Sequence, residues 1–172
     1  MSSDPAADDH IVHQDEHTAR TNRVVLIPVD ESSSSKYAIN WSIENFLRPE
    51  TDMVVLIHVR PLYASSGNFA TSYVEMGGYA TTVEDQYRDG SHKLLIEFTR
   101  LLKQRNILSQ AFAMRGDARD EILRKSVEVK ADLVIMGSRG LGTIKRALLG
   151  SVSDYCAHHL TMPLIIVKEE RR

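Results

Sequence analysis

The sequence has one cysteine, no long run of apolar residues and no large excess of charge of one sign. Cys156 has no partner for an internal disulfide, which favours a reducing compartment. No stretch approaches the roughly 18 consecutive apolar residues of a membrane span, and no apolar signal core follows the N-terminus. The net charge of −2 supplies no basic field for nucleic acid. We therefore expect a cytoplasmic protein, with a nuclear location also open, that binds neither a membrane nor nucleic acid.

Several catalytic motifs are also absent. No lysine directly precedes a serine or threonine at the end of a glycine loop, which disfavours a P-loop ATPase. No Gly-x-Gly-x-x-Gly follows the first apolar run, which disfavours a dinucleotide dehydrogenase, and no His-x-Gly-His motif of adenylyl-transferring α/β folds occurs. The serines and histidines of 151–159 lie within about two and a half turns of one predicted helix, so they do not surround a common centre as a hydrolytic triad must. We assign no catalytic residue.

The chain is long enough for one domain of ordinary size. Its 172 residues are 42% hydrophobic and 26% charged, a balance typical of globular proteins. Residues 1–22 are rich in acidic side chains and poor in large apolar ones, so we predict a disordered tail there. The predicted domain spans 23–169, and 170–172 form a short C-terminal tail.

Within this domain, apolar runs alternate with helical patterns. The predicted strands are Val24–Val29, Met53–Val59, Ser109–Met114, Asp132–Met136 and Leu164–Val167. Helices are predicted from the capping serines at 32–35 to Phe46, and over 82–105, 117–129 and 151–160, with a long loop over 60–78. Strands separated by helices favour right-handed crossovers. We therefore predict an open, doubly wound α/β sandwich, with a five-stranded parallel sheet and helices on both faces.

The segment 137–153 is the most informative part of the sequence. It follows the predicted strand Asp132–Met136, contains four glycines and ends where a helix begins. Glycine allows a ligand close to bare backbone, and the unpaired N–H groups of a helix N-terminus bind anions such as phosphate. The order of strand, glycine loop and helix start predicts a nucleotide site.

The glycine spacing also carries a resemblance. Gly137, Gly140, Gly150 and Ser151 match Gly-x2-Gly-x9-Gly-[Ser/Thr], which resembles the ATP-binding signature of the universal stress protein family. The sequence of residues 144–156 is similar to that of plant-type members in particular. It reads Ile-Lys-Arg-Ala-Leu-Leu-Gly-Ser-Val-Ser-Asp-Tyr-Cys. The resemblance extends from about Arg23 to Lys168. It implies a fold like that of the adenine nucleotide alpha hydrolases, with ATP as ligand and Mg²⁺ or Mn²⁺ as its companion.

In open α/β sheets, ligands bind outside the carboxyl ends of the strands, where the winding reverses. The ends of the first, second and fourth predicted strands should meet there. With the resemblance, the expected nucleotide-binding residues are Pro28, Val29, Asp30, Val59, Met136, Gly137, Arg139, Gly140, Gly150, Ser151, Val152 and Ser153.

The resemblance implies a role for each group of these residues. The backbone N–H groups of Gly140 and of 150–153, with the hydroxyls of Ser151 and Ser153, should hold the triphosphate. Asp30 should bind the ribose or base region, or a metal held with the phosphates. Val59 should present main-chain groups to the adenine edge, and Gly137 should lie against the nucleoside.

Structural alternatives exist for several of these roles. Asp30 could cap the helix that follows it, alone or in addition, and Ser151 and Ser153 could be ordinary capping residues. Arg139 could pair with a phosphate or point to solvent.

These expectations combine into a hypothesis about function. The chain should be an ATP-binding stress-response module whose output is a conformational or assembly change. Because the family typically dimerises through its last strand, we expect a homodimer through Leu164–Val167. One alternative is a slow ATP hydrolase or phosphotransferase in which Asp30 places a metal. Another is an interaction scaffold that does not use nucleotide.

Overall fold

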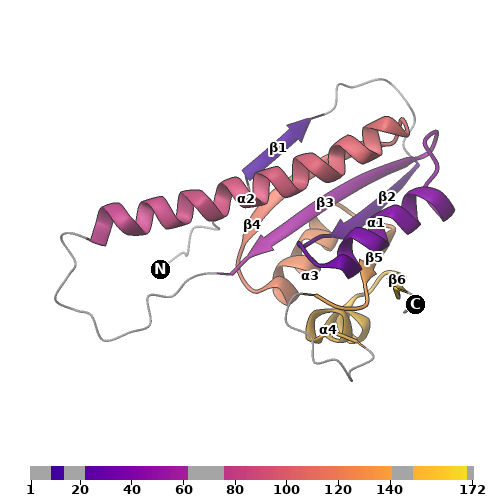
Figure 1. The fold of residues 1–172 in the computed structure, drawn as a ribbon. Helices are drawn as coiled ribbons and strands as arrows, with labels where there is room; N and C mark the ends of the chain where they lie inside the picture. The colour runs from indigo at the N-terminus through magenta and orange to yellow at the C-terminus, as the bar shows by residue number, and fades with distance from the viewer. Residues whose placement is uncertain (1–8, 14–21, 62–75, 141–148, 170–172) are drawn as a thin grey trace.

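The computed structural model describes residues 9–13, 22–61, 76–140 and 149–169 (Figure 1). Its strands are β1 (Asp9–His13), β2 (Arg23–Pro28), β3 (Asp52–Arg60), β4 (Leu108–Arg115), β5 (Leu133–Gly137) and β6 (Leu164–Val167). Its helices are α1 (Ser33–Asn45), α2 (Met76–Gln104), α3 (Ala118–Glu128) and α4 (Ser151–His159). Within the described residues no helix has both the length and the hydropathy to cross a membrane.

All six strands form one sheet in the order β1-β4-β3-β2-β5-β6. Strands β2 to β6 are parallel to their neighbours, which confirms the predicted five-stranded parallel sheet. From β2, the strand order runs through β3 to β4 toward one edge and through β5 to β6 toward the other. The winding therefore reverses between β2 and β5. Helices α1 and α2 cover one face of the sheet, and α3 and α4 lie on the other (Figure 1).

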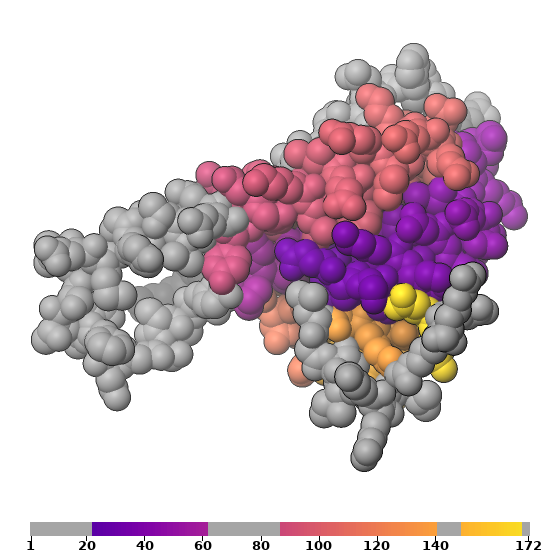
Figure 2. Space-filling view, viewed as in Figure 1, coloured from indigo at the N-terminus to yellow at the C-terminus, as the bar shows by residue number. Residues whose placement is uncertain are grey.

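Each central strand is buried on both faces because helices cover both. In β2, Val25 and Ile27 pack with residues of α1 and α2, whereas Leu26 packs with residues of α3 and α4. All three side chains are at most 1% exposed. This period of two explains the uninterrupted apolar run in the sequence. Figure 2 views the molecule from the side of α1 and α2.

The sheet contains one strand that the sequence analysis did not predict. β1 pairs antiparallel with β4, so the prediction of disorder is wrong for residues 9–13. The physical reason is that the outer edge of β4 offers unpaired N–H and C=O groups to any extended segment that reaches it. The rest of the predicted tail and residues 170–172 lie outside the described residues. So does most of the predicted 60–78 loop, although β3 extends to Arg60 and α2 begins at Met76, six residues before the predicted start.

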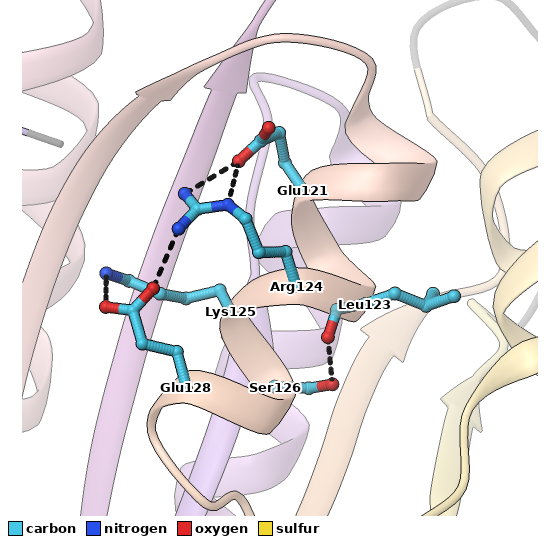
Figure 3. A network of polar contacts seen from close by, with 6 residues as sticks. All are labelled: Glu121, Leu123, Arg124, Lys125, Ser126 and Glu128. Atoms are coloured by element: carbon cyan, nitrogen blue, oxygen red, sulfur yellow. Dashed lines mark hydrogen bonds and ion pairs between the residues drawn. The ribbon is translucent and has the colours of Figure 1, made fainter. Parts of the chain in front are cut away.

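A network of ion pairs joins side chains of α3 (Figure 3). The Arg124 guanidinium lies 2.8 Å from both Glu121 and Glu128. Lys125 is 1% exposed, yet its Nζ lies 2.7 Å from Glu128 and 3.8 Å from the centre of the Phe112 ring on β4. The lysine stem thus fills space between helix and sheet while its ammonium group reaches a carboxylate at the surface. The ion pairs all lie within α3, and the contact of Lys125 with Phe112 is the one in this network that joins the helix to the sheet.

The amino end of the sheet is closed by a network around Asp52. This carboxylate is 1% exposed and accepts hydrogen bonds from the Arg23 guanidinium, the Arg48 N–H and the Thr51 hydroxyl. Burial alone would raise the pKa of Asp52, but these donors outweigh burial and hold it below its ordinary value. Arg23 also lies over the Phe46 ring, 4.6 Å from its centre.

Candidate functional site

Asp30 lies just beyond the carboxyl end of β2, beside the reversal of the winding. Its Oδ1 accepts hydrogen bonds from the N–H and the hydroxyl of Ser32. Ser32 is the N-cap of α1, and its Oγ accepts from the Ser35 N–H at 3.1 Å. Asp30 therefore does not cap α1 itself; it orients the residue that does. This arrangement uses one carboxylate oxygen and turns the other toward the end of β5.

The second oxygen of Asp30 faces Gly140. A Cβ atom at Gly140 would lie 2.8 Å from Asp30 Oδ2, closer than real Cβ contacts come. Only glycine lets the chain after β5 approach this carboxylate so closely. The structure thus brings together two of the predicted site residues that are 110 positions apart in sequence.

A second close approach joins the same loop to α1. A Cβ atom at Gly137 would lie 2.8 Å from the carbonyl oxygen of Ser34 and 2.9 Å from its carbonyl carbon. The Arg139 N–H donates to Ser34 Oγ at 3.3 Å. The contact of Gly137 with Ser34 accounts for this glycine without a nucleoside, the partner that the sequence analysis expected. Its role is to seat the loop on the first turn of α1.

The two ends of the glycine loop are tied together at Ser138. Its carbonyl oxygen accepts hydrogen bonds from the Gly150 N–H at 2.8 Å and from the Ser153 hydroxyl at 3.0 Å. Ser153 is 2% exposed, and its hydroxyl also lies 3.0 Å from the carbonyl oxygen of Gly150. A hydroxyl has one proton to donate, and here it points at main-chain carbonyls. In this structure the Ser153 hydroxyl therefore closes the loop, and its contact with phosphate stays a prediction.

The N-terminus of α4 differs from those of α1 and α3. Its N-cap is Gly150, with φ −78° and ψ 161°, and among the described residues no side chain caps the helix. The first hydrogen bond of α4 runs from the Asp154 N–H to the Gly150 carbonyl, so the N–H groups of 151–153 precede it. A Cβ atom at Gly150 would lie 3.6 Å from the backbone nitrogen of Gly140. The start of α4 and Gly140 thus place main-chain N–H groups in one small region, which is suited to an anion.

The other predicted residues occupy the strands behind this region. Val29 and Met136 are each 5% exposed and belong to the core, and Pro28 is the last residue of β2. Val59 is half-buried near the end of β3, on the opposite side of β2 from β5. These residues are apolar and lie at the strand ends, whereas Asp30 and the main chain at the glycines and at the start of α4 are polar.

A comparison with known protein families matches a segment that contains all of these residues. A model of the universal stress protein family matches residues 21–168, most of the chain. The chain belongs to the universal stress protein family. Members similar to it include universal stress protein PHOS34 of Arabidopsis thaliana, which is 27% identical over 166 residues. That match covers 88% of this chain and 64% of the relative, so the chain spans less than two thirds of the relative's length.

Two solved structures share the fold of this universal stress protein chain. The hypothetical protein MJ0577 has a TM-score of 0.73 at 19% identity, with 88% of this chain and 99% of that one covered. A universal stress protein family protein from Arabidopsis thaliana, solved with AMP bound, has a TM-score of 0.60 at 25% identity and covers 86% and 92%. The Arabidopsis matches confirm the plant-type resemblance.

His58, for which no role is predicted from the sequence, lies beside the site in this universal stress protein. His58 is on β3, and its Nδ1 is hydrogen-bonded to the Ser91 hydroxyl of α2. Burial lowers its pKa, assisted by Arg60, while the carboxylates of Glu31 and Asp30 oppose the shift. The neutral ring is therefore favoured at neutral pH. The sequence signal for His58 was its position directly before Val59. Only the fold brings His58 within electrostatic range of the Asp30 carboxylate.

Cys156 lies in α4 and takes no part in the site. It is 0% exposed, and burial raises its pKa to about 11, so the thiol stays protonated at neutral pH. It packs in the core as a small apolar residue. Within the described parts of the chain, no three His, Cys, Asp or Glu side chains gather in a way that could hold a metal ion.

Proposed function

We propose that this chain is a regulatory module that binds an adenine nucleotide, ATP or AMP, at the carboxyl ends of β2 and β5. The observation that carries the proposal is the uncapped N-terminus of α4 beside Gly140, with Asp30 opposite. A nucleotide has an anionic phosphate and a hydroxylated sugar. The phosphate matches the N–H groups at the start of α4, and the sugar hydroxyls match the Asp30 carboxylate. The AMP bound to the Arabidopsis relative supports the choice of adenine.

The phosphate belongs at the start of α4. The N–H groups of Ser151, Val152 and Ser153 carry the positive end of the helix dipole, which favours an anion by roughly 0.3–1 kcal/mol at an exposed site. The Ser151 side chain is exposed at this end, so its hydroxyl can add a donor. Arg139 is half-buried at the loop and would supply charge to the same group.

The ribose belongs beside Asp30. An ionised carboxylate only accepts hydrogen bonds, so it suits the hydroxyls of the sugar and repels phosphate oxygens. The same oxygen atoms suit Mg²⁺ or Mn²⁺, whose remaining ligands would be phosphate oxygens of the nucleotide and water. The main chain at Val59 would face the adenine edge, one strand further along the sheet.

The proposed output is assembly. β6 is the last strand of the sheet, and Leu164, Ile165 and Ile166 are only half-buried. A second copy that pairs with this edge would bury them, giving a homodimer with two-fold symmetry. We place the protein in the cytoplasm, where adenine nucleotides are plentiful enough to regulate it.

Calorimetric titration of nucleotide-stripped protein with AMP and ATP, with and without Mg²⁺, tests the proposal. We expect one site per chain. Gly150→Val should abolish binding without unfolding the chain, because the side chain would project toward the Gly140 N–H. The backbone at Gly150 suits any residue, so the variant should fold.

Cys156→Ala, altered in the same helix but in the core, is the matched control and should keep its affinity. A folded Gly150→Val variant that binds like the unaltered protein would remove the phosphate site from α4. Absence of binding in the unaltered protein would favour a scaffold that does not use nucleotide.

A further inference from the structure

The sheet ends differently on its two sides. One edge is β6, which is parallel to its neighbour. The other edge is β1, the only antiparallel strand among the described residues, whose partners run from Asp9 opposite Ala113 to His13 opposite Gln110. The parallel sheet alone would end at β4. β1 therefore covers an edge that the five parallel strands leave open (Figure 1).

Without β1, the outer edge of β4 would be well suited to pairing with another chain. β4 is eight residues long and pairs with β3 along its whole length without a register shift. From Leu108 to Met114 it has neither a charged residue nor a proline, the features that usually protect an edge strand. A long, regular and uncharged edge is a template for a further strand.

β1 is a much poorer template. It has five residues, and its register with β4 shifts between His10 and Val12. Short length and a local irregularity both discourage the addition of another strand. The chain thus replaces an edge that invites pairing by one that resists it.

The connection to β2 allows β1 to come from the same chain. β1 runs opposite to β4, so His13 lies toward the amino end of the sheet, where Arg23 begins β2. Three strand spacings, about 14 Å, separate β1 from β2. The intervening residues 14–22 can reach roughly 30 Å. Helix α2 also packs near β1.

We propose that the outer edge of β4 is a strand-binding surface occupied by the chain's own residues 9–13, and that a second copy of the chain pairs there when these residues are removed. β1 thereby restricts edge-to-edge association to β6. With both edges open, β4 of one copy could pair with β6 of the next, a contact that does not close and so builds chains of copies. The limit of two copies per assembly depends on the proposed dimer through β6. The pairing of residues 9–13 with β4 does not depend on that dimer.

Two truncations test the proposal. One lacks residues 1–14 and so loses β1, and the other lacks residues 1–7 and keeps it. Sedimentation velocity over a range of concentrations gives the mass, and hydrogen exchange reports on the amides of β4. Loss of 1–14 should raise the mean mass at least twofold at high concentration, and speed β4 exchange at low concentration. Loss of 1–7 should change neither.

Two results would overturn the proposal. One is unchanged β4 exchange after loss of 1–14, because β1 would then not protect that edge. The other is faster exchange with no gain in mass, because the open edge would then not bind a second copy. Val12→Pro in the full chain, compared with Val12→Ala, repeats the test if the truncated chain does not fold, since proline disrupts the strand. AMP titration of each variant separates this proposal from the nucleotide site, because affinity should be unchanged throughout.

Discussion

The two ends of the parallel sheet differ in how their polar groups are hydrogen-bonded. At the amino end, Asp52 is buried and accepts hydrogen bonds from Arg23, Arg48 and Thr51, so its polar network is closed. At the carboxyl end, the N-cap of α4 is a glycine, which has no side chain to accept from the first-turn N–H groups. The first end closes its hydrogen bonds within the chain, whereas the second is where we propose that main-chain N–H groups bind a phosphate.

The same contrast holds between helices at the carboxyl end. α1 is capped by Ser32 and α3 by Asp117, whose carboxylate accepts from the Arg119 N–H at 2.8 Å. α4 follows the glycine loop and lacks such a cap. Glycine at an N-cap costs only a few tenths of a kcal/mol relative to serine or aspartate, so α4 gives up little stability by lacking a side-chain cap. The difference separates helices that only support the sheet from the one proposed to bind phosphate.

Opening the amino end should have the largest effect on stability. Asp52→Ala leaves the donors of Arg23, Arg48 and Thr51 without their acceptor, at a position that is 1% exposed. We expect a loss of about 2–3 kcal/mol in the free energy of unfolding, measured in urea. Nucleotide affinity, measured at a temperature where the variant is folded, should stay within a factor of two. A large loss of affinity in the folded variant would mean that the two ends are coupled.

Closing the carboxyl end should have the next largest effect, and on binding rather than stability. Gly150→Asp gives α4 the kind of cap that Asp117 gives α3, and puts a negative charge where phosphate is proposed to lie. We expect AMP affinity to fall at least about tenfold, or roughly 1.4 kcal/mol. The melting temperature should stay level or rise, since aspartate is a good N-cap. Unchanged affinity in calorimetry would show that the start of α4 is not the phosphate site.

Removing the cap of α3 gives the converse experiment. Asp117→Ala should destabilise the chain by about 1 kcal/mol, because one first-turn N–H of α3 loses its acceptor. Denaturant unfolding measures this change. Calorimetry with AMP should show the same affinity as the unaltered protein. A weakened nucleotide complex would make α3, and not α4 alone, part of the binding end.

The smallest expected effect concerns pH. The pKa of His58 lies below its ordinary value of 6.5 in the folded chain, so the unfolded chain takes up a proton first as the pH falls. The stability that neutral His58 contributes is complete above that value and is lost as the pH drops below it. Unfolding free energies at pH 7.5 and 5.5 should therefore differ less in His58→Gln than in the unaltered protein. Equal differences in the two proteins would exclude His58 as a source of the pH dependence of stability.

The prediction from sequence succeeded where the local pattern and the tertiary environment agree. The apolar run of β2 required helices on both faces of the sheet, and the fold provides them. The prediction failed for residues 9–13, because their strand exists only through pairing with β4, which lies about 100 positions later in the chain. It also gave no sign of the bond from the Ser153 hydroxyl to the Ser138 carbonyl, because that carbonyl lies across the loop.

The sequence by itself determined the order of strands and helices, the glycine spacing and the family, because periodicity and spacing are properties of the chain as written. Only the tertiary structure decided what two of the glycines are for: Gly137 makes room for the Ser34 backbone, and Gly140 for the Asp30 carboxylate. It also decided that α4 begins uncapped and that β4 is covered. These are contacts between segments distant in sequence, and their energies depend on distances that no local pattern records.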